Sequence, residues 1–144
     1  MVVQSLARHT RFWQFVKFCV VGGGGVVVDM AVLRFLVVRC GWNLSLSKVC
    51  AAEAALLNNF LWNEVWTFRG FGGGNGGRAG MLRRLLKFHA ICGVGIGLAL
   101  LLLNFFYGWL GFNLYAANFL AILLVTFWNF WLNTLFNWRV KPRG

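Results

Sequence analysis

An asparagine- and aromatic-rich motif occurs twice in this chain and limits what the chain can fold into. The first copy, NNFLWNEVWTFR, spans residues 58–69, and the second, WNFWLNTLFNWR, spans residues 128–139. In each copy an Asn-Phe pair is followed one helical turn later by a second Asn, and the copy ends in Arg. The residue numbers of matching positions differ by 70, as for Asn59 and Asn129. A fixed period of this kind indicates two structural units related by duplication.

The same shift of 70 residues holds well outside the motif. The matches are largely Gly, Asn, Lys and Arg, whereas chance matches in an apolar chain would be mostly Leu, Val and Ala. They include Lys17-Phe18 with Lys87-Phe88, Gly23 and Gly25 with Gly93 and Gly95, and GWNL at 41–44 with GFNL at 111–114. We therefore predict a single membrane domain over 1–144. It contains repeat one at about 1–70, a glycine-rich linker at about 70–80, and repeat two at about 81–140.

Apolar residues make up 60% of the 144 residues, more than a soluble domain of this size can bury. A helix crosses a bilayer with roughly 20 apolar residues, and helices are the spanning form that satisfies its own backbone. The sequence therefore predicts an all-α integral membrane protein in which each repeat is a hairpin of two transmembrane helices. Because two crossings return the chain to its starting side, both hairpins should have the same orientation, as parallel repeats do. The four predicted spans are about Phe18–Val38, Val49–Trp66, Phe88–Leu110 and Leu114–Phe136.

The net charge of +11 would suggest a nucleic-acid partner in a soluble protein, but its placement favours membrane topology. The positive-inside rule then predicts a multi-pass protein of the cytoplasmic membrane with both termini in the cytoplasm, and no nucleic-acid partner. Attraction to anionic membrane lipids is an additional interpretation of the same charges. The basic residues of the predicted inner side are Arg8, Arg11, Lys17, Arg69, Arg78, Arg83, Arg84, Lys87, Arg139, Lys141 and Arg143.

Asp29, Arg34, Lys48 and Glu53 fall within or beside the predicted spans of the first hairpin, where ionisable residues are candidates for function. At about 1.5 Å of rise per residue, Asp29 should lie level with Glu53. Arg34 and Lys48 should form a second level nearer the outer face. One interpretation is that acids and bases neutralise each other across the hairpin, with Lys48 snorkelling outward. The other is a polar pocket for an anionic headgroup, with Arg34 on a phosphate and an acid on sugar hydroxyls or a proton.

The second hairpin does not keep these charges. Ala99 and Leu123 stand where the acids would be, and Asn104 and Asn118 stand where the bases would be. Charges needed only for folding a hairpin would be expected in both copies. The asymmetry therefore favours a single site between the halves.

Two pairs of asparagines lie near the inner ends of the second and fourth predicted helices. Asn59 and Asn63 in one repeat, and Asn129 and Asn133 in the other, are four residues apart and share a helix face. They either form interhelical hydrogen bonds that tie the repeats together or line a cytoplasmic vestibule for a headgroup.

Glycines at 22–25, and again at 93, 95 and 97, interrupt the first and third predicted helices. Small residues let membrane helices approach closely, so we expect the first and third helices to pack together there. The alternative is a flexible or broken helix beside a transport path.

Catalytic chemistry is not expected, because the three acids are scattered and no Ser/His/Asp or Cys/His set can be assembled. We accordingly expect no cofactor and no metal. The four cysteines lack metal-ligand spacing, and a disulfide between Cys40 and Cys50 is left open.

The segments FVKFCVVGGGGVVVD, AAEAALLNNFLWNEVWTFR and ILLVTFWNFWLNTLFNWR together resemble the GtrA-like family of small four-helix membrane proteins, over about residues 11–139. Gly23, Asp29, Glu53, Asn59 and Asn63 fall where that family's motif is familiar. The resemblance implies a role in cell-surface polysaccharide synthesis, namely the translocation of polyprenyl-phosphate-linked sugars across the cytoplasmic membrane. It also implies an alternative, because related segments anchor polyprenyl-phosphate glycosyltransferases.

The leading hypothesis is therefore a flippase whose partners are an isoprenoid-phosphate-linked sugar and membrane lipids. The alternative is a non-transporting anchor or partner of a membrane glycosyltransferase. A small cation exporter is disfavoured by the strong charge bias and the parallel duplication. Four helices enclose a large glycolipid poorly, so a parallel homodimer is expected. The candidate substrate-binding residues are Asp29, Arg34, Lys48, Glu53, Asn59, Asn63, Asn104, Asn129 and Asn133.

Overall fold

The computed structural model describes residues 2–70 and 77–138, and it describes side chains for residues 10–70 and 77–138 except Tyr115. This part of the chain is helical, with short turns and no strand, which confirms the predicted all-α class. Most of the predicted linker, residues 71–76, and the last basic residues, 139–143, lie outside the described residues. The elements in order are α1 (Val2–Arg34), η1 (Phe35–Arg39), α2 (Leu44–Trp62), η2 (Asn63–Thr67), α3 (Gly77–Asn104), η3 (Phe105–Trp109) and α4 (Leu114–Phe136).

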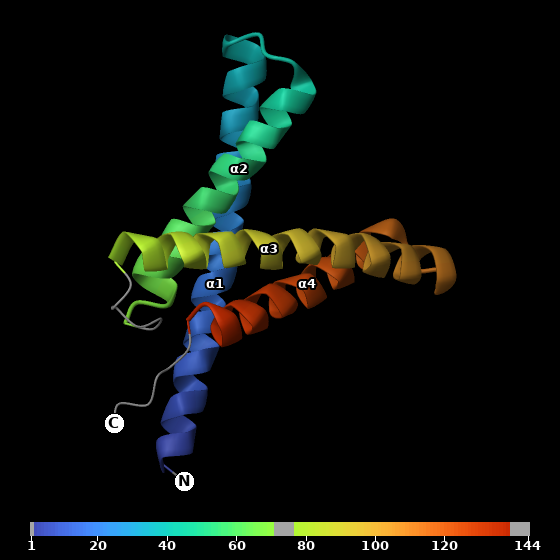
Figure 1. Cartoon of the computed structure of the whole chain (residues 1–144). Coiled ribbons are helices and arrows are strands. Elements are labelled where there is room, and N and C mark those ends of the chain that lie inside the picture. Colours follow the sequence, from blue (N-terminus) through green and yellow to red (C-terminus); the bar gives the residue numbers. More distant parts are fainter. Residues whose placement is uncertain (1, 71–76, 139–144) are drawn as a thin grey trace. The chain divides into compact units, whose positions relative to one another are not determined.

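The helices pair into two hairpins that belong to separate compact units, Met1–Arg69 and Gly70–Gly144. Within the first unit α1 packs along α2, and within the second α3 packs along α4 (Figure 1). Among the described residues, three stretches are long and apolar enough to cross a membrane: Thr10–Arg39, Gly77–Trp109 and Ala116–Phe136. The sequence predicted four spans. The remaining helix, α2, has 19 residues, carries Lys48, Glu53 and two adjacent asparagines, and is not among these three stretches.

The repeated tetrapeptides GWNL and GFNL form the turns of the two hairpins. Gly41 and Gly111 adopt left-handed backbones with φ of 66° and 68°, a conformation that glycine reaches without a Cβ penalty. Asn43 then caps α2, because its Oδ1 accepts a hydrogen bond from the Ser45 amide at 2.9 Å. Asn113 caps α4 in the same way. The turn residues therefore recur because each copy needs a left-handed helix exit and a polar helix start.

A π-helical turn precedes each of these two loops, and the sequence analysis did not anticipate it. The π-helical turns η1 (Phe35–Arg39) and η3 (Phe105–Trp109) lie 70 residues apart. The same backbone hydrogen bond follows each turn. The Trp42 amide donates to the Leu36 carbonyl at 3.1 Å, and the Phe112 amide donates to the Phe106 carbonyl at 3.0 Å. The duplication therefore extends to irregular backbone geometry.

Equivalent aromatic residues form the core of each hairpin near the end opposite the turn. The rings of Phe18 and Phe68 lie 6.4 Å apart, edge to face. In the second unit Phe88 and Trp138 form the same contact at 6.1 Å. Such pairs stabilise packing by about 0.5–1.5 kcal/mol beyond the area that they bury. The other buried apolar residues are Val21, Ala51 and Phe60 in the first unit and Ala117, Ala121 and Phe130 in the second.

One glycine in each hairpin is in close contact with the helix opposite it. A Cβ added to Gly25 would lie only 2.7 Å from Cγ of Asn59, and a Cβ on Gly95 would lie 2.6 Å from Oδ1 of Asn129. These close approaches occur inside each hairpin. The predicted packing of the first helix against the third stays a prediction. The alternative of a broken helix does not hold, since α1 runs without interruption from Val2 to Arg34.

We predict that Gly25→Ala and Gly95→Ala each destabilise the protein by about 1–3 kcal/mol, because the new methyl group forces the opposing asparagine out of its buried place. The measurement is thermal unfolding in detergent, followed by circular dichroism. Gly23→Ala is the matched control, since a Cβ there meets nothing within 4 Å. It should leave stability unchanged or raise it slightly through helix propensity. Equal stability of all three variants would contradict the close-contact interpretation.

Candidate functional site

The first hairpin contains an ion pair between its two helices. Nζ of Lys48, in the second turn of α2, lies 2.6 Å from Oδ2 of Asp29 on α1. The Asp29 side chain is 19% exposed and the Lys48 side chain 56% exposed. Neutralisation across the hairpin, one of the two interpretations of the sequence, is therefore what the structure shows for this pair. The long lysine side chain reaches the acid instead of snorkelling outward. The two levels estimated from helical rise stay a prediction.

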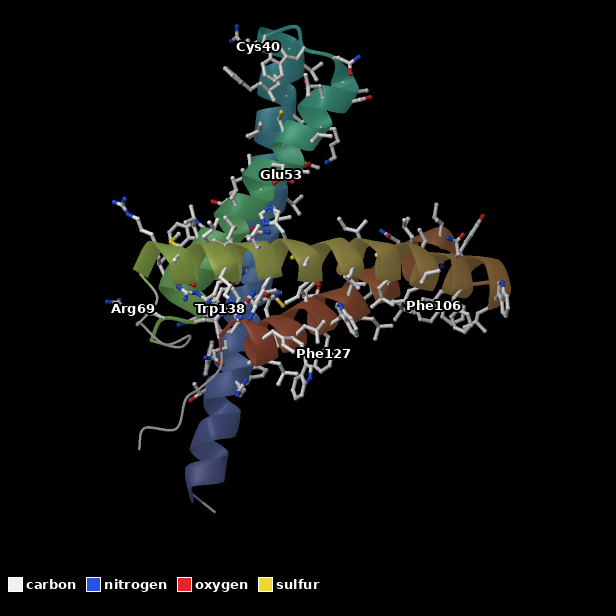
Figure 2. All side chains as sticks on the ribbon, viewed as in Figure 1. Cys40, Glu53, Arg69, Phe106, Phe127 and Trp138 are labelled. Carbon is white, nitrogen blue, oxygen red and sulfur yellow. The ribbon has the colours of Figure 1, made fainter. Side chains whose placement is uncertain are left out.

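The other two ionisable candidates of the first hairpin, Arg34 and Glu53, have different surroundings. Arg34 is exposed at the end of α1 and lines a surface hollow of about 490 Å³ with Ala31, Phe35, Val38 and Arg39. Glu53 is exposed on α2, and Figure 2 shows it between Cys40 at the turn and Arg69 at the other end of the hairpin. Among the described residues, the lining of the hollow includes no acid. The structure thus brings Asp29 and Lys48 together and places Arg34 in a separate hollow.

The paired asparagines lie inside their own hairpins. Asn63 is 1% exposed and Asn133 is fully buried. The Asn133 carboxamide donates to the Asn129 carbonyl at 2.8 Å and accepts from Nδ2 of Asn137 at 2.6 Å. Oδ1 of Asn59 and Oδ1 of Asn129 are buried without a hydrogen-bond partner in the described part of the chain. Packing within a hairpin is therefore the observed environment of these residues, and a headgroup vestibule stays a prediction.

Asn104 ends α3 at the position equivalent to Arg34. Its Nδ2 donates to the Leu100 carbonyl of its own helix at 2.8 Å, and the residue is exposed. Asn104, Asn129 and Asn133 belong to the second unit, whereas the charged candidates belong to the first. A single site that joins the two sets stays a prediction.

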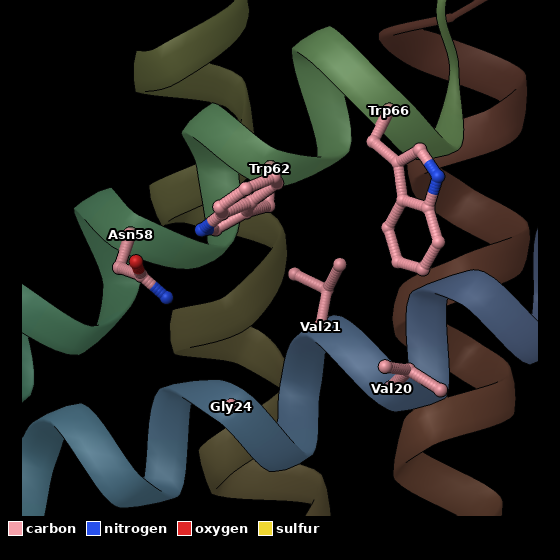
Figure 3. Close-up of a pocket in the computed structure, with 6 residues that line it drawn as sticks. All are labelled: Val20, Val21, Gly24, Asn58, Trp62 and Trp66. Atoms are coloured by element: carbon pink, nitrogen blue, oxygen red, sulfur yellow. The ribbon is translucent and has the colours of Figure 1, made fainter.

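A groove between α1 and α2 was missed by the sequence analysis. It has a volume of about 300 Å³ and opens on the surface of the first unit (Figure 3). The signal was present in the spacing, because Asn58 and Trp62 are four apart on one face of α2, and Trp66 follows four residues later in η2. They oppose residues of α1 that are also one turn apart. The lining consists of Val20, Val21 and Gly24 from α1, Asn58 and Trp62 from α2, and Trp66 from η2.

Lys17 lies beside this groove. Its Nζ is 5.3 Å from the centroid of the Trp66 ring, a cation–π contact that holds the ammonium at one end of the groove. In the second unit the equivalent Lys87 instead donates to the Phe136 carbonyl at 3.4 Å, near the C-terminus of α4. The two equivalent lysines therefore have different partners.

Cysteines and metal-ligating clusters contribute no further site among the described residues. All four thiols are free, with Cys40 exposed and Cys50 half-buried, so the disulfide left open by the sequence is not formed. The described residues contain no group of three or more His, Cys, Asp or Glu side chains placed to hold a metal ion.

Comparison with known proteins gives one family. The model of the GtrA/DPMS transmembrane domain matches residues 17–138. A dolichol-phosphate mannosyltransferase of Pyrococcus furiosus is 34% identical over 115 residues, which cover 77% of this chain and 30% of that protein. The uncharacterized membrane protein YngA of Bacillus subtilis is 35% identical over 52 residues, which cover 36% of this chain and 34% of that protein. The chain thus spans about a third of the length of each of these relatives.

We predict that Asp29→Asn and Lys48→Met each lower the thermal stability of the detergent-solubilised protein more than the double variant does. Each single change leaves one charge without its partner in an apolar setting, whereas the double change removes both charges. A double-mutant cycle of unfolding temperatures measures this coupling. Asn118→Met, at the exposed position equivalent to Lys48, is the control and should have no effect. Strictly additive losses from the two single changes would show that the ion pair does not couple the helices.

Proposed function

Because this chain belongs to the GtrA/DPMS transmembrane-domain family, which is linked to polyprenyl-phosphate sugar metabolism, we propose that it translocates a polyprenyl-phosphate-linked sugar across the cytoplasmic membrane. The reaction would serve the synthesis of cell-surface polysaccharide. In this proposal the protein forms and breaks no covalent bond. It supplies a path for the polar headgroup through a layer in which such a group is otherwise poorly solvated.

The observation that carries the proposal is the ion pair between Asp29 and Lys48. An ion pair within an apolar hairpin is weak evidence for stability, because desolvation offsets much of the attraction. The second hairpin has the same turn, cap and glycine contact, with Ala99 and Asn118 at the equivalent positions. A hairpin of this design therefore folds without the ion pair, and function is the better explanation for its presence in the first copy.

The ion pair also suggests how an anionic headgroup is received. In the free protein the Asp29 carboxylate holds the Lys48 ammonium at 2.6 Å. When a lipid phosphate arrives, it takes over the ammonium through charge-assisted hydrogen bonds, and the carboxylate is released to accept hydrogen bonds from sugar hydroxyls. The exchange never leaves the ammonium without an anion. In this proposal Glu53 on α2, and Arg34 in its separate hollow at the end of α1, add further polar contacts along the path of the headgroup.

Topology and assembly are part of the same proposal. The described basic residues Arg11, Lys17 and Arg69 gather at the end of the first hairpin opposite its turn, and Arg78, Arg83, Arg84 and Lys87 lie in the first turns of α3. By the positive-inside rule this distribution favours cytoplasmic termini. A parallel homodimer would give a large glycolipid a wider enclosure than one chain.

A second function is favoured by one of the relatives. The matching region of the Pyrococcus furiosus dolichol-phosphate mannosyltransferase is 30% of that protein, so a domain of this kind occurs within a longer chain named as a glycosyltransferase. The present chain could act in the same way as a separate subunit that anchors or orients such an enzyme. In that role the ion pair would bind or position the lipid acceptor without moving it across the membrane.

We predict that the double variant Asp29→Asn/Lys48→Met, and separately Glu53→Gln, lower translocation by at least about tenfold while the proteins insert and fold normally. The assay reconstitutes the purified chain in liposomes with a fluorescent polyprenyl-phosphate sugar in one leaflet and follows its appearance in the other. Glu64→Gln, which removes the remaining acid of the chain, is the control and should retain the wild-type rate.

Wild-type rates in the double variant would show that the ion pair is structural and would remove the main support for the site. Absence of movement in folded wild-type protein would contradict the flippase and favour the partner subunit. The matching measurement is then co-purification with a membrane glycosyltransferase and stimulation of its activity.

A further inference from the structure

The groove of the first hairpin has apolar walls and a floor without a side chain. Figure 3 shows the indoles of Trp62, at the end of α2, and Trp66, in η2, extending over α1, with Val21 pointing between them. Gly24 forms part of the floor, and a Cβ built there would meet nothing within 4 Å. Trp62 is 52% exposed, so its ring stands as a wall of the groove instead of filling the core. The groove is therefore open space bounded by rigid side chains.

The duplication shows that folding does not require this groove. At the positions equivalent to Gly24 and Asn58 the second hairpin has Val94 and Trp128, which add volume where the first hairpin is open. The indoles of the first hairpin are replaced by Leu132 and Phe136. Both hairpins share their turn, cap and core, so the open groove and its two tryptophans are a separate property of the first unit.

A positive charge stands at one end of the groove. The Lys17 ammonium is held over the face of Trp66 at 5.3 Å, and Lys17 lies one helical turn before Val20 and Val21. Contact with an aromatic face leaves the N–H donors of an ammonium available to an anion. Lys87, its equivalent, already donates to a backbone carbonyl at a helix end. The exposed Arg69 follows Trp66 by three residues and adds a second positive charge at this end.

The occupant must therefore be apolar along most of its length and anionic at one end. Trp66 lies eight positions after Asn58, across the end of α2 and into η2, which corresponds to about 12 Å of groove. This is long enough for more than one isoprene unit, and a groove with a single channel suits one branched chain better than the paired chains of a phospholipid. We infer that the groove holds the phosphate-proximal isoprene units of a polyprenyl phosphate, with its phosphate on Lys17.

This inference rests on the proposed function and adds the place where the lipid part of the substrate is held. The isoprenoid chain of the lipid lies against Val21, Gly24 and the two indoles, and its phosphate remains at the end where the basic residues gather. The sugar then projects from the same end, outside the groove. This bound state lies on the same hairpin as the Asp29–Lys48 pair and precedes the step of the proposed function in which the phosphate reaches Lys48.

The test measures binding, not transport, with the full chain in phosphatidylcholine nanodiscs. A long-chain polyprenyl phosphate without sugar is titrated, and bound lipid is counted by native mass spectrometry. Gly24→Leu should weaken binding by at least about tenfold, and Trp62→Leu, which installs the residue of the second hairpin, should weaken it severalfold. Gly23→Leu is the matched control, because its Cβ position is also open but does not line the groove. Lys17→Gln should weaken binding, whereas Lys87→Gln should not.

The possible results distinguish failure of the groove inference from failure of the proposed function. If the wild type binds the polyprenyl phosphate and both Gly24→Leu and Trp62→Leu bind as tightly, the groove is not the site, although the proposed function stands. If the wild type binds phosphatidylglycerol as tightly as polyprenyl phosphate, both the groove's occupant and the proposed substrate class are wrong. If binding appears only when the lipid carries a sugar, the groove holds the sugar and the inference is overturned. Loss of binding in the groove variants, with Gly23→Leu unaffected, supports it.

Discussion

The close contact between one glycine and one asparagine in each hairpin is the constraint on which the rest of the structure depends. Gly25 against Asn59, and Gly95 against Asn129, bring the two helices of a hairpin together where their side chains would otherwise hold them apart. Packing and hydrogen bonds drive helix association in lipid, because apolar side chains gain little by leaving one apolar solvent for another. The aromatic core of each hairpin lies toward its open end, and the glycine turn with its asparagine cap joins the two close helices at the other end.

The duplication provides an internal control for interpreting function. Features present in both units, such as the left-handed glycine, the asparagine cap and the aromatic core, are explained by folding. Features present in one unit need another explanation. Asp29, Lys48, the open space at Gly24 and the two indoles all belong to the first hairpin. An ion pair and an apolar groove with a cation at its end are suited to the headgroup and the chain of an anionic lipid.

Much of the fold was predictable from the sequence, whereas the environments of the site residues were not. The shift of 70 residues predicted two hairpins, and the turn tetrapeptides recur at helix ends as expected. Helical rise placed Lys48 above Asp29, but the reach of its side chain decided the contact. The π-helical turns depend on backbone hydrogen bonds that no residue pattern revealed. The groove exists because Gly24 has no side chain. Such an opening between two helices can be recognised only when it is known which residues of the two helices face each other.

We propose that the first hairpin, and not the second, handles the lipid-linked substrate. Photo-crosslinking tests it most directly, with a polyprenyl-phosphate sugar that carries its photoreactive group in the isoprene units nearest the phosphate. After irradiation of the wild-type chain in membranes, the labelled peptides are identified by mass spectrometry. We expect labels within the first unit, on peptides that contain Val20–Gly24 or Asn58–Trp66. Equal labelling of the equivalent peptides of α3 and α4 would contradict it.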